Sequence, residues 1–181
     1  MVASAEAVLP LETLRTELRI PSGDTEHDGI IYQHRQAAID WIEEETQRSI
    51  MDRSMDLQLV YQYDDEPLDI GKVPDLKKDI THQINWWRFE DSIWEAPTQT
   101  RPAGRFTEYT QHRWRVYPFE NQWPPAQKSM LIFKLETGMN EVPAAFQQAT
   151  ILWARALYNG NATLPERATV LRLLEPFMAV S

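Results

Sequence analysis

The segment VPAAFQQATILWARALYNGNA, residues 142–162, most constrains what this chain can fold into. Its apolar residues recur at helical spacing, and the flanks of the main apolar stripe are apolar too. Only a narrow polar edge remains, formed by Gln148, Arg155 and Asn159. A helix that is apolar on nearly all sides has to be covered over most of its surface. We therefore expect this helix to be covered over most of its surface, and its residues alone leave open what covers it.

A second long helix is predicted over residues 25–49, with Asp24 or Thr25 placed to cap its start. Its apolar stripe becomes charged one turn before its end, at Glu45 and Arg48. Two interpretations remain open. The two residues can form an i,i+3 ion pair on a solvated helix end, or this end can meet another subunit.

Shorter helices are predicted towards both ends of the chain. Leu11 to Ile20 have helical apolar spacing, and Gly160 can end the central helix in a left-handed conformation. Thr163 and Glu166 then have the spacing of a capping box at the start of a last helix, which Pro176 stops.

The middle of the chain differs from both ends in its composition. Seven of the twelve prolines and five of the seven tryptophans lie between Pro67 and Pro125. Four segments are typical of strands because they are rich in β-branched and aromatic residues between turn residues: 57–63, 79–87, 106–117 and 129–135. Alternation places one set of side chains on a common face: Ile80, His82, Ile84 and Trp86. The connections between Trp94 and Phe106 and between Pro118 and Lys128 are expected to be irregular.

These patterns predict an α+β fold in a single domain, residues 1–181. The helices of residues 1–52 and 142–181 form a bundle, and residues 53–141 form an inserted antiparallel, β-rich and tryptophan-rich segment.

Charge and composition exclude several classes of protein. The formal net charge of −9 argues against binding of nucleic acid through phosphate neutralisation, which needs clustered Lys and Arg. An acidic surface can still let duplex DNA pass without adhering. The chain has no cysteine, which removes disulfides and thiolate sites, and no apolar run long enough to span a bilayer.

No catalytic, cofactor-binding or metal-binding residues are predicted. The four histidines, His27, His34, His82 and His112, lack the spacing of a metal motif. Acidic runs at 43–45 and 64–66 are typical of solvated faces, and the chain has no phosphate loop and no nucleophile elbow. An acid-dyad hydrolase would need two facing carboxylates, for example among Asp64, Asp65 and Glu90, and nothing in the sequence favours that arrangement.

The tryptophan cluster is the strongest binding candidate that residue chemistry alone provides: Trp86, Trp87, Trp94, Trp114 and Trp123. Such side chains can fill a core, anchor a protein interface or form a platform for sugars and bases. A small ligand- or carbohydrate-binding module with a tryptophan-rich sheet is therefore an alternative function.

Residues 11–50 resemble the N-terminal half of the tailed-phage head–tail connector family, the head-completion adaptors. In that family a short helix ending in L-R-I precedes an acidic turn and a long helix that closes in an A-x-x-W/Y-x-E-x-x-T-x-R pattern. With some slack in the register, this chain supplies Ala38, Trp41, Glu44, Thr46 and Arg48.

The C-terminal region, residues 129–177, resembles the closing pattern of the same family: a strand, a Gly turn, V-P, an Ala-rich helix ending in L-Y-x-N, and a short helix ending in L-L-x-P. The matching residues are Val142, Pro143, Ala149, Leu157, Tyr158, Asn159, Leu173, Leu174 and Pro176. Two positions depart from the pattern, since Gly160 replaces a frequent Arg and Gly138-Met139 replaces a frequent G-Y.

The resemblance implies a structural protein of the virion neck, not an enzyme, assembled in the host cytoplasm. It would form a ring with itself, of twelvefold symmetry, beneath the portal protein, extend the DNA channel, and dock a stopper or tail-completion protein. DNA would pass as non-specific cargo, and no membrane is involved. The same module occurs in virus-derived gene-transfer particles.

Four sets of contact residues follow as hypotheses. The portal interface would use Leu174, Phe177, Met178 and Val180. Subunit–subunit contacts would use Glu45, Arg48, Ile151 and Tyr158. The neck partner would meet Trp87, Trp94 and Trp123. The acidic residues facing the channel would be Glu43 and Glu44.

Overall fold

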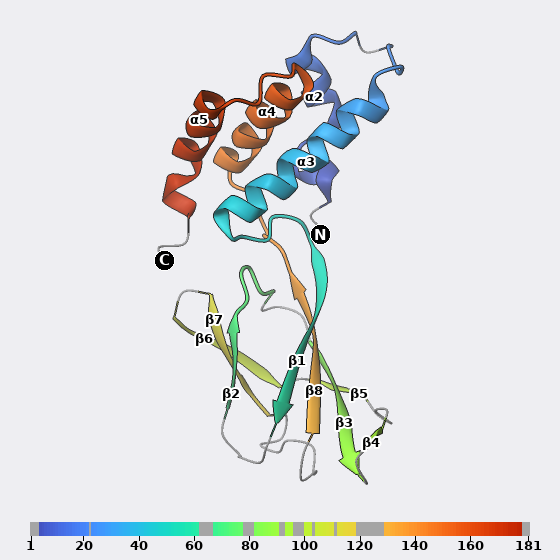
Figure 1. Ribbon diagram of the computed structural model, residues 1–181, viewed down its shortest axis with the longest axis vertical. Helices are drawn as coiled ribbons and strands as arrows, with labels where there is room; N and C mark the ends of the chain where they lie inside the picture. Colours follow the sequence, from blue (N-terminus) through green and yellow to red (C-terminus); the bar gives the residue numbers. More distant parts are fainter. Residues whose placement is uncertain are drawn as a thin grey trace. The chain divides into compact units, whose positions relative to one another are not determined.

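The computed structural model describes residues 4–21, 23–61, 67–77, 82–90, 93–95, 100–102, 104–110, 112–118 and 129–178. The chain divides into a helical unit, Met1–Asp52 with Met139–Ser181, and a β unit, Arg53–Gly138 (Figure 1). The predicted α+β class is confirmed, with N- and C-terminal helices and antiparallel strands between them. Residues 139–141 belong to the helical unit, not to the inserted segment, because Met139 is buried in the helical core.

The helical unit has a central helix, as the sequence predicts. Its elements are α1 (Ala5–Val8), α2 (Leu11–Leu18), α3 (Asp28–Thr46), α4 (Ala144–Tyr158), α5 (Leu164–Leu174) and the 3-10 turn η2 (Glu175–Phe177). Helix α4 packs against α2, α3 and α5. Within the described residues, no helix combines the length and the apolar character needed to cross a membrane.

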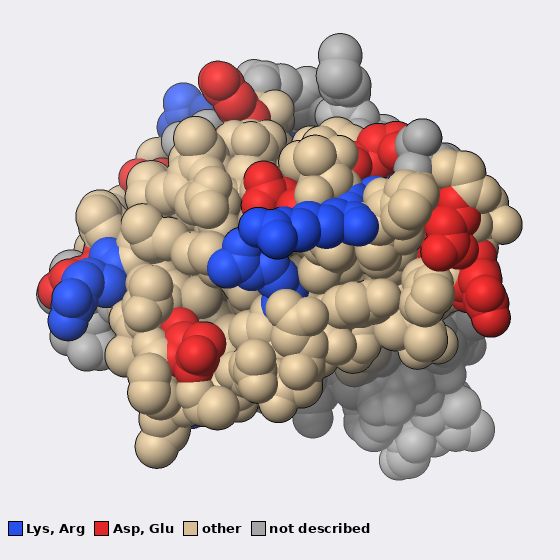
Figure 2. All heavy atoms as spheres, turned by 90° about the horizontal axis from the view of Figure 1, so that it is seen from above, with Lys and Arg blue, Asp and Glu red and all other residues tan. Residues whose placement is uncertain are grey.

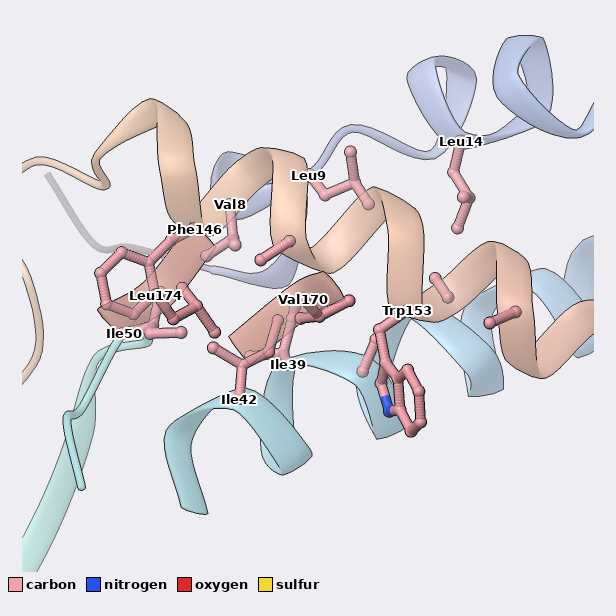
Figure 3. Packing of buried hydrophobic residues seen from close by; sticks show 14 of the residues in the cluster. Val8, Leu9, Leu14, Ile39, Ile42, Ile50, Phe146, Trp153, Val170 and Leu174 are labelled. Carbon is pink, nitrogen blue, oxygen red and sulfur yellow. The ribbon is translucent and has the colours of Figure 1, made fainter. Parts of the chain in front are cut away.

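The core of the helical unit forms around α4, whose buried residues are Phe146, Ala149, Thr150, Trp153, Ala154 and Ala156. Figure 3 shows Ile39 and Ile42 of α3 and Val170 and Leu174 of α5 converging on the same interior. The one buried hydroxyl of α4 is satisfied locally, since Thr150 Oγ1 donates to the Phe146 carbonyl oxygen at 2.7 Å. Helix α4 is therefore covered largely by its own chain; its flanks, such as Ile151 and Tyr158, are half-buried, and Gln148 and Arg155 of its polar edge are exposed.

The predicted helix ends are confirmed in part. Gly160 has φ 68° and follows Asn159, the C-cap of α4, as expected for a left-handed stop. The predicted cap of α3 is wrong: His27 precedes the helix, and Asp24 instead accepts the Glu26 backbone N–H at 3.0 Å. The capping box also differs from expectation, because the Thr163 hydroxyl donates to the Glu166 carboxylate and no side chain caps the backbone of α5.

Two buried arginines attach the N-terminal helices to α3. Arg15 of α2 pairs with Asp28, and Arg35 of α3 pairs with Glu6 and donates to the Leu9 carbonyl oxygen at 3.0 Å. Both guanidinium groups are almost completely shielded from solvent. An arginine in this setting needs partners, since a buried charge without them is strongly destabilising.

The β unit contains two antiparallel sheets. The strands are β1 (Arg53–Tyr61), β2 (Leu68–Lys72), β3 (Gln83–Glu90), β4 (Ile93–Glu95), β5 (Thr100–Pro102), β6 (Arg105–Thr110), β7 (Arg113–Tyr117) and β8 (Ser129–Thr137). The larger sheet has the order β1-β8-β3-β4, with β5 also paired to β3, and the smaller sheet has the order β2-β7-β6 (Figure 1).

The predicted strands differ from the observed ones at particular points. Residues 106–117 do not form one strand, because the chain reverses between β6 and β7 at His112, which has φ 57°. Strand β5 lies in a stretch expected to be irregular, and β2 was not predicted at all. The predicted loop 118–128 lies, after Pro118, outside the described residues.

The core of the β unit contains Trp114, one of the five clustered tryptophans. Its side chain is 2% exposed, and its indole Nε1 donates to the Val73 carbonyl oxygen at 2.8 Å. Around it lie the other buried residues: Ile70, Val73, Leu76, Ile84, Val116, Leu131, Phe133 and Leu135. For Trp114, the core interpretation is therefore correct.

His82 is buried in the β unit, on the same face as Ile84, as the alternation predicts. The side chains of Ile80 and Trp86 lie outside what the structure describes. Nε2 of His82 lies 2.7 Å from the Lys77 carbonyl oxygen, and Nδ1 accepts the Glu136 backbone N–H at 3.2 Å. This pairing fits the neutral ring with the proton on Nε2, and burial lowers the pKa of His82 below its ordinary value.

Acid is expected to destabilise the β unit through His82. The unfolded chain takes up the proton near pH 6.5, whereas the folded chain resists it, so the free energy of unfolding falls as the pH drops below that value. Urea unfolding of the wild type and of His82→Gln, between about pH 7.5 and about pH 5.5, checks this. The difference in free energy of unfolding between the wild type and His82→Gln should shrink as the pH falls. If the free energies of the two proteins instead changed in parallel with pH, the expectation would be contradicted.

Candidate interaction surfaces

The described residues do not assemble a recognisable catalytic centre. Among them, no group of three His, Asp or Glu side chains could hold a metal ion. A hollow of about 250 Å³ lies between α4 and α5, and its charged lining residues are Arg155 and Glu166. Glu166 accepts a hydrogen bond from the Thr163 hydroxyl. The acid-dyad candidates Asp64, Asp65 and the side chain of Glu90 lie outside what the structure describes.

The predicted portal residues that the structure describes, Leu174, Phe177 and Met178, lie at the end of α5 or just beyond it and differ in exposure. Leu174 is 0% exposed in the helical core and so presents no surface to a partner in this fold. Phe177 is half-buried and packs edge-on against Phe146, with ring centroids 5.1 Å apart. Met178 is half-buried, and its backbone N–H donates to the Leu174 carbonyl oxygen at 3.1 Å. Val180 lies outside the described residues.

The predicted subunit-contact residues are half-buried at the flanks of the helical core. Ile151 packs against the core, and Tyr158 meets His34 edge-on, with ring centroids 6.1 Å apart. Glu45 forms an ion pair with Arg167 of α5, which the i,i+3 interpretation did not anticipate. Arg48 donates its backbone N–H to the Glu43 carbonyl oxygen at 3.3 Å.

An aromatic and charged cluster joins α3, α4 and α5, and sequence reasoning did not predict it. Trp41 stacks on Trp153 with ring centroids 4.3 Å apart, and Arg167 lies over Trp41 while it pairs with Glu45. The sequence signalled only that Trp41 and Trp153 lie on the apolar stripes of their helices. It gave no sign of the Glu45–Arg167 pair, because these residues lie more than a hundred positions apart along the chain. The cluster links α5 to α3, and Glu45 thus has a partner within its own subunit.

The two acidic residues predicted to face the channel have different environments. Glu43 is half-buried, and its carboxylate accepts the backbone N–H groups of Ile50 (2.6 Å) and Met51 (3.0 Å). It therefore fixes the chain as it leaves α3. Glu44 is exposed in the last turn of α3, where the helix dipole disfavours a negative charge.

Figure 2 shows one face of the molecule, on which most of the visible described surface is uncharged. Acidic side chains gather in separate small groups, and basic side chains lie between them. The described residues on this face do not form a continuous acidic wall.

The tryptophans predicted to meet the neck partner are placed only in part. Trp87 lies in β3, where it pairs with Met130 of β8, and Trp94 lies in β4 opposite Phe89. Their side chains, and the whole of Trp123, lie outside what the structure describes. Their role remains a prediction.

Comparisons with known proteins give a match at the level of fold. No family model matches the sequence, and no curated protein matches it. Three solved structures are similar over 100% of this chain. The first is a chain in the neck of an empty gene transfer agent (GTA) particle computed with C6 symmetry, with 18% identity, a TM-score of 0.66 and 94% of that chain covered. The second is a chain in the virion of a native GTA particle, with 19% identity, a TM-score of 0.64 and 94% of that chain covered. The third is a chain in the neck of a native GTA particle computed with C12 symmetry, with 18% identity, a TM-score of 0.61 and 93% of that chain covered. The chain therefore shares the fold of these proteins along its whole length.

Proposed function

We propose that this chain is the subunit of a head–tail connector in a tailed phage or a gene transfer agent. In this role it is a structural protein and not an enzyme. Copies form a ring in the virion neck beneath the portal, extend the channel through which DNA passes, and dock the stopper or tail-completion protein.

The observation that carries this proposal is the fold similarity over the full chain, which covers both the helical and the β unit. The similar chains come from particle necks computed with sixfold and twelvefold symmetry. Independent support comes from the two connector-like sequence blocks, which build α2 and α3 at one end and β8, α4 and α5 at the other. Proteins that share a fold can differ in function, so the role needs its own test.

The exposed surface at the end of α5 is our candidate for the portal contact. Leu173 is 37% exposed there and Met178 is half-buried, whereas Leu174 and Phe177 stabilise the core. Removing residues 176–181 would therefore disturb the fold as well as any interface, and point substitutions of Leu173 and Met178 separate the two effects.

We expect Leu173→Asp with Met178→Asp to weaken binding to the portal encoded with this chain by ~10-fold or more, because a charge would be buried at an apolar contact. Surface-immobilised portal and the purified variants provide the measurement. The matched control is Leu164→Asp, at the other end of α5 and 78% exposed, which should bind like the wild type. Undiminished binding by the double variant would remove this surface from the interface.

A further inference from the structure

The outward face of the small sheet β2-β7-β6 is basic, although the chain as a whole is acidic. Along β7 the buried positions are Trp114 and Val116, so Arg113, Arg115 and Tyr117 lie on the opposite face. We define the basic face by its four exposed cations and two tyrosines: Lys72, Arg105, Tyr109, Arg113, Arg115 and Tyr117.

The positive charge on this face is only partly compensated within the subunit. Lys72 lies directly opposite Arg113 in the β2–β7 register, and like charges in that position repel. Within the described part of the chain, none of the four cations forms an ion pair. Asp69 lies beside them, but its carboxylate accepts the Tyr109 hydroxyl at 2.5 Å and the Gly71 backbone N–H at 2.7 Å. A negative partner would therefore relieve repulsion that the isolated subunit carries.

Two of the arginines are already held in position for a partner. The Arg105 guanidinium lies 4.8 Å from the ring centroid of Tyr117, and that of Arg115 lies 4.5 Å from the ring centroid of Tyr109. A guanidinium over an aromatic ring keeps N–H groups available for bidentate contacts with carboxylates. Less side-chain freedom is then lost when a partner binds.

The complementary charge is present in the same chain. The helical unit, residues 1–52 and 139–181, holds 14 acidic and 7 basic residues, a net charge of −7. The β unit, residues 53–138, holds 13 acidic and 11 basic residues, a net charge of −2. The helical unit therefore carries an excess of negative charge that can attract the basic face of a neighbouring copy.

We propose that the basic face binds the acidic helical unit of a second copy of this chain. The inference rests on the proposed ring and names a surface through which its copies meet. The composition of the face favours a protein partner over duplex DNA, because Arg and Tyr are enriched in protein interfaces.

Sedimentation equilibrium of the full chain at low and high NaCl tests this inference. The wild type should self-associate, and added salt should weaken the association because exposed charges are screened. Arg115→Glu should weaken it by ~10-fold or more, since a like charge at the contact is costly. Arg105→Glu should act in the same direction and provides a second variant if either one folds poorly. The control is Lys134→Glu, with the same charge change at an exposed position of β8, which should stay within ~3-fold of the wild type.

Several results would overturn the inference. A wild type that shows no attraction between copies at any salt concentration would do so, as would reversal variants that associate like the wild type. A wild type that instead binds a short DNA duplex through Arg115 would assign the face to phosphate. If Arg115→Glu still formed rings on the portal, the inference about the basic face would be wrong while the proposed function stood. If copies associated through Arg115 but never assembled on the portal, the proposed function would be wrong while the contact through the basic face stood.

Discussion

Phe146→Ala is expected to lower the free energy of unfolding of the helical unit by about 3–5 kcal/mol, the usual cost of removing a buried aromatic ring. Phe146 is 0% exposed at the start of α4, and its ring meets Phe177 edge-on. The substitution leaves a cavity beside η2, so the end of α5 should also loosen. Urea unfolding monitored by far-UV circular dichroism measures the loss, and hydrogen exchange of residues 164–178 shows where it acts.

Leu164→Ala is the matched control for Phe146→Ala, because it removes an aliphatic side chain that is 78% exposed on the same unit. Its effect should stay within about 0.5 kcal/mol. If Phe146→Ala were equally mild, the arrangement of α4 as the buried centre of the bundle would be wrong.

Trp114→Ala is expected to destabilise the β unit by about 3–5 kcal/mol through its cavity, with about 1–3 kcal/mol more because the buried Val73 carbonyl oxygen loses its donor. Trp114→Phe keeps most of the volume but not the hydrogen bond, so it should fall clearly between the wild type and Trp114→Ala. Urea unfolding of the three proteins gives the ranking.

The exposed Met55 of β1 provides the comparison for Trp114, and Met55→Ala should be close to neutral. If Trp114→Ala were also close to neutral, Trp114 would not lie in the core, and the tryptophan-rich sheet would again become a candidate ligand platform.

The helical part of the fold could be predicted because its signals are local. The apolar periodicity of α4 indicated a central helix, and Gly160 marked its end. The buried arginines were not predicted, because Arg15 and Arg35 are paired through residues distant in sequence, and an isolated arginine is usually expected on the surface. The same reason applies to the Glu45–Arg167 pair.

The β unit was harder to predict because the positive-φ residue of its β6–β7 turn is not one of the usual turn residues. The β6–β7 reversal places His112, not Gly or Asn, at positive φ, so residues 106–117 looked like one strand. In β2, Asp69 and Gly71 weakened the strand signal of residues 68–72. The basic face forms because the register of three strands brings its cations together, and that register could not be predicted. The negative net charge of the whole chain gave no indication of a basic surface.

Contact residues could be nominated from the sequence, but only exposure separates a surface residue from a core residue. Leu174 was nominated for the portal interface together with Met178, but the structure places Leu174 in the core of the helical unit. Glu43 matched the acidic run, yet its carboxylate holds the backbone at Ile50 and Met51. A sequence pattern does not show whether a side chain is already engaged in hydrogen bonds within its own subunit.

The most direct test of the connector account is the number of copies that assemble on the portal. Native mass spectrometry of this chain, first alone over a concentration series and then mixed with the portal encoded with it, measures that number. The account predicts a closed ring of twelve copies on the portal, as in the twelvefold symmetry used for the similar particle neck. A chain that stays monomeric and does not associate with the portal at any concentration would contradict it.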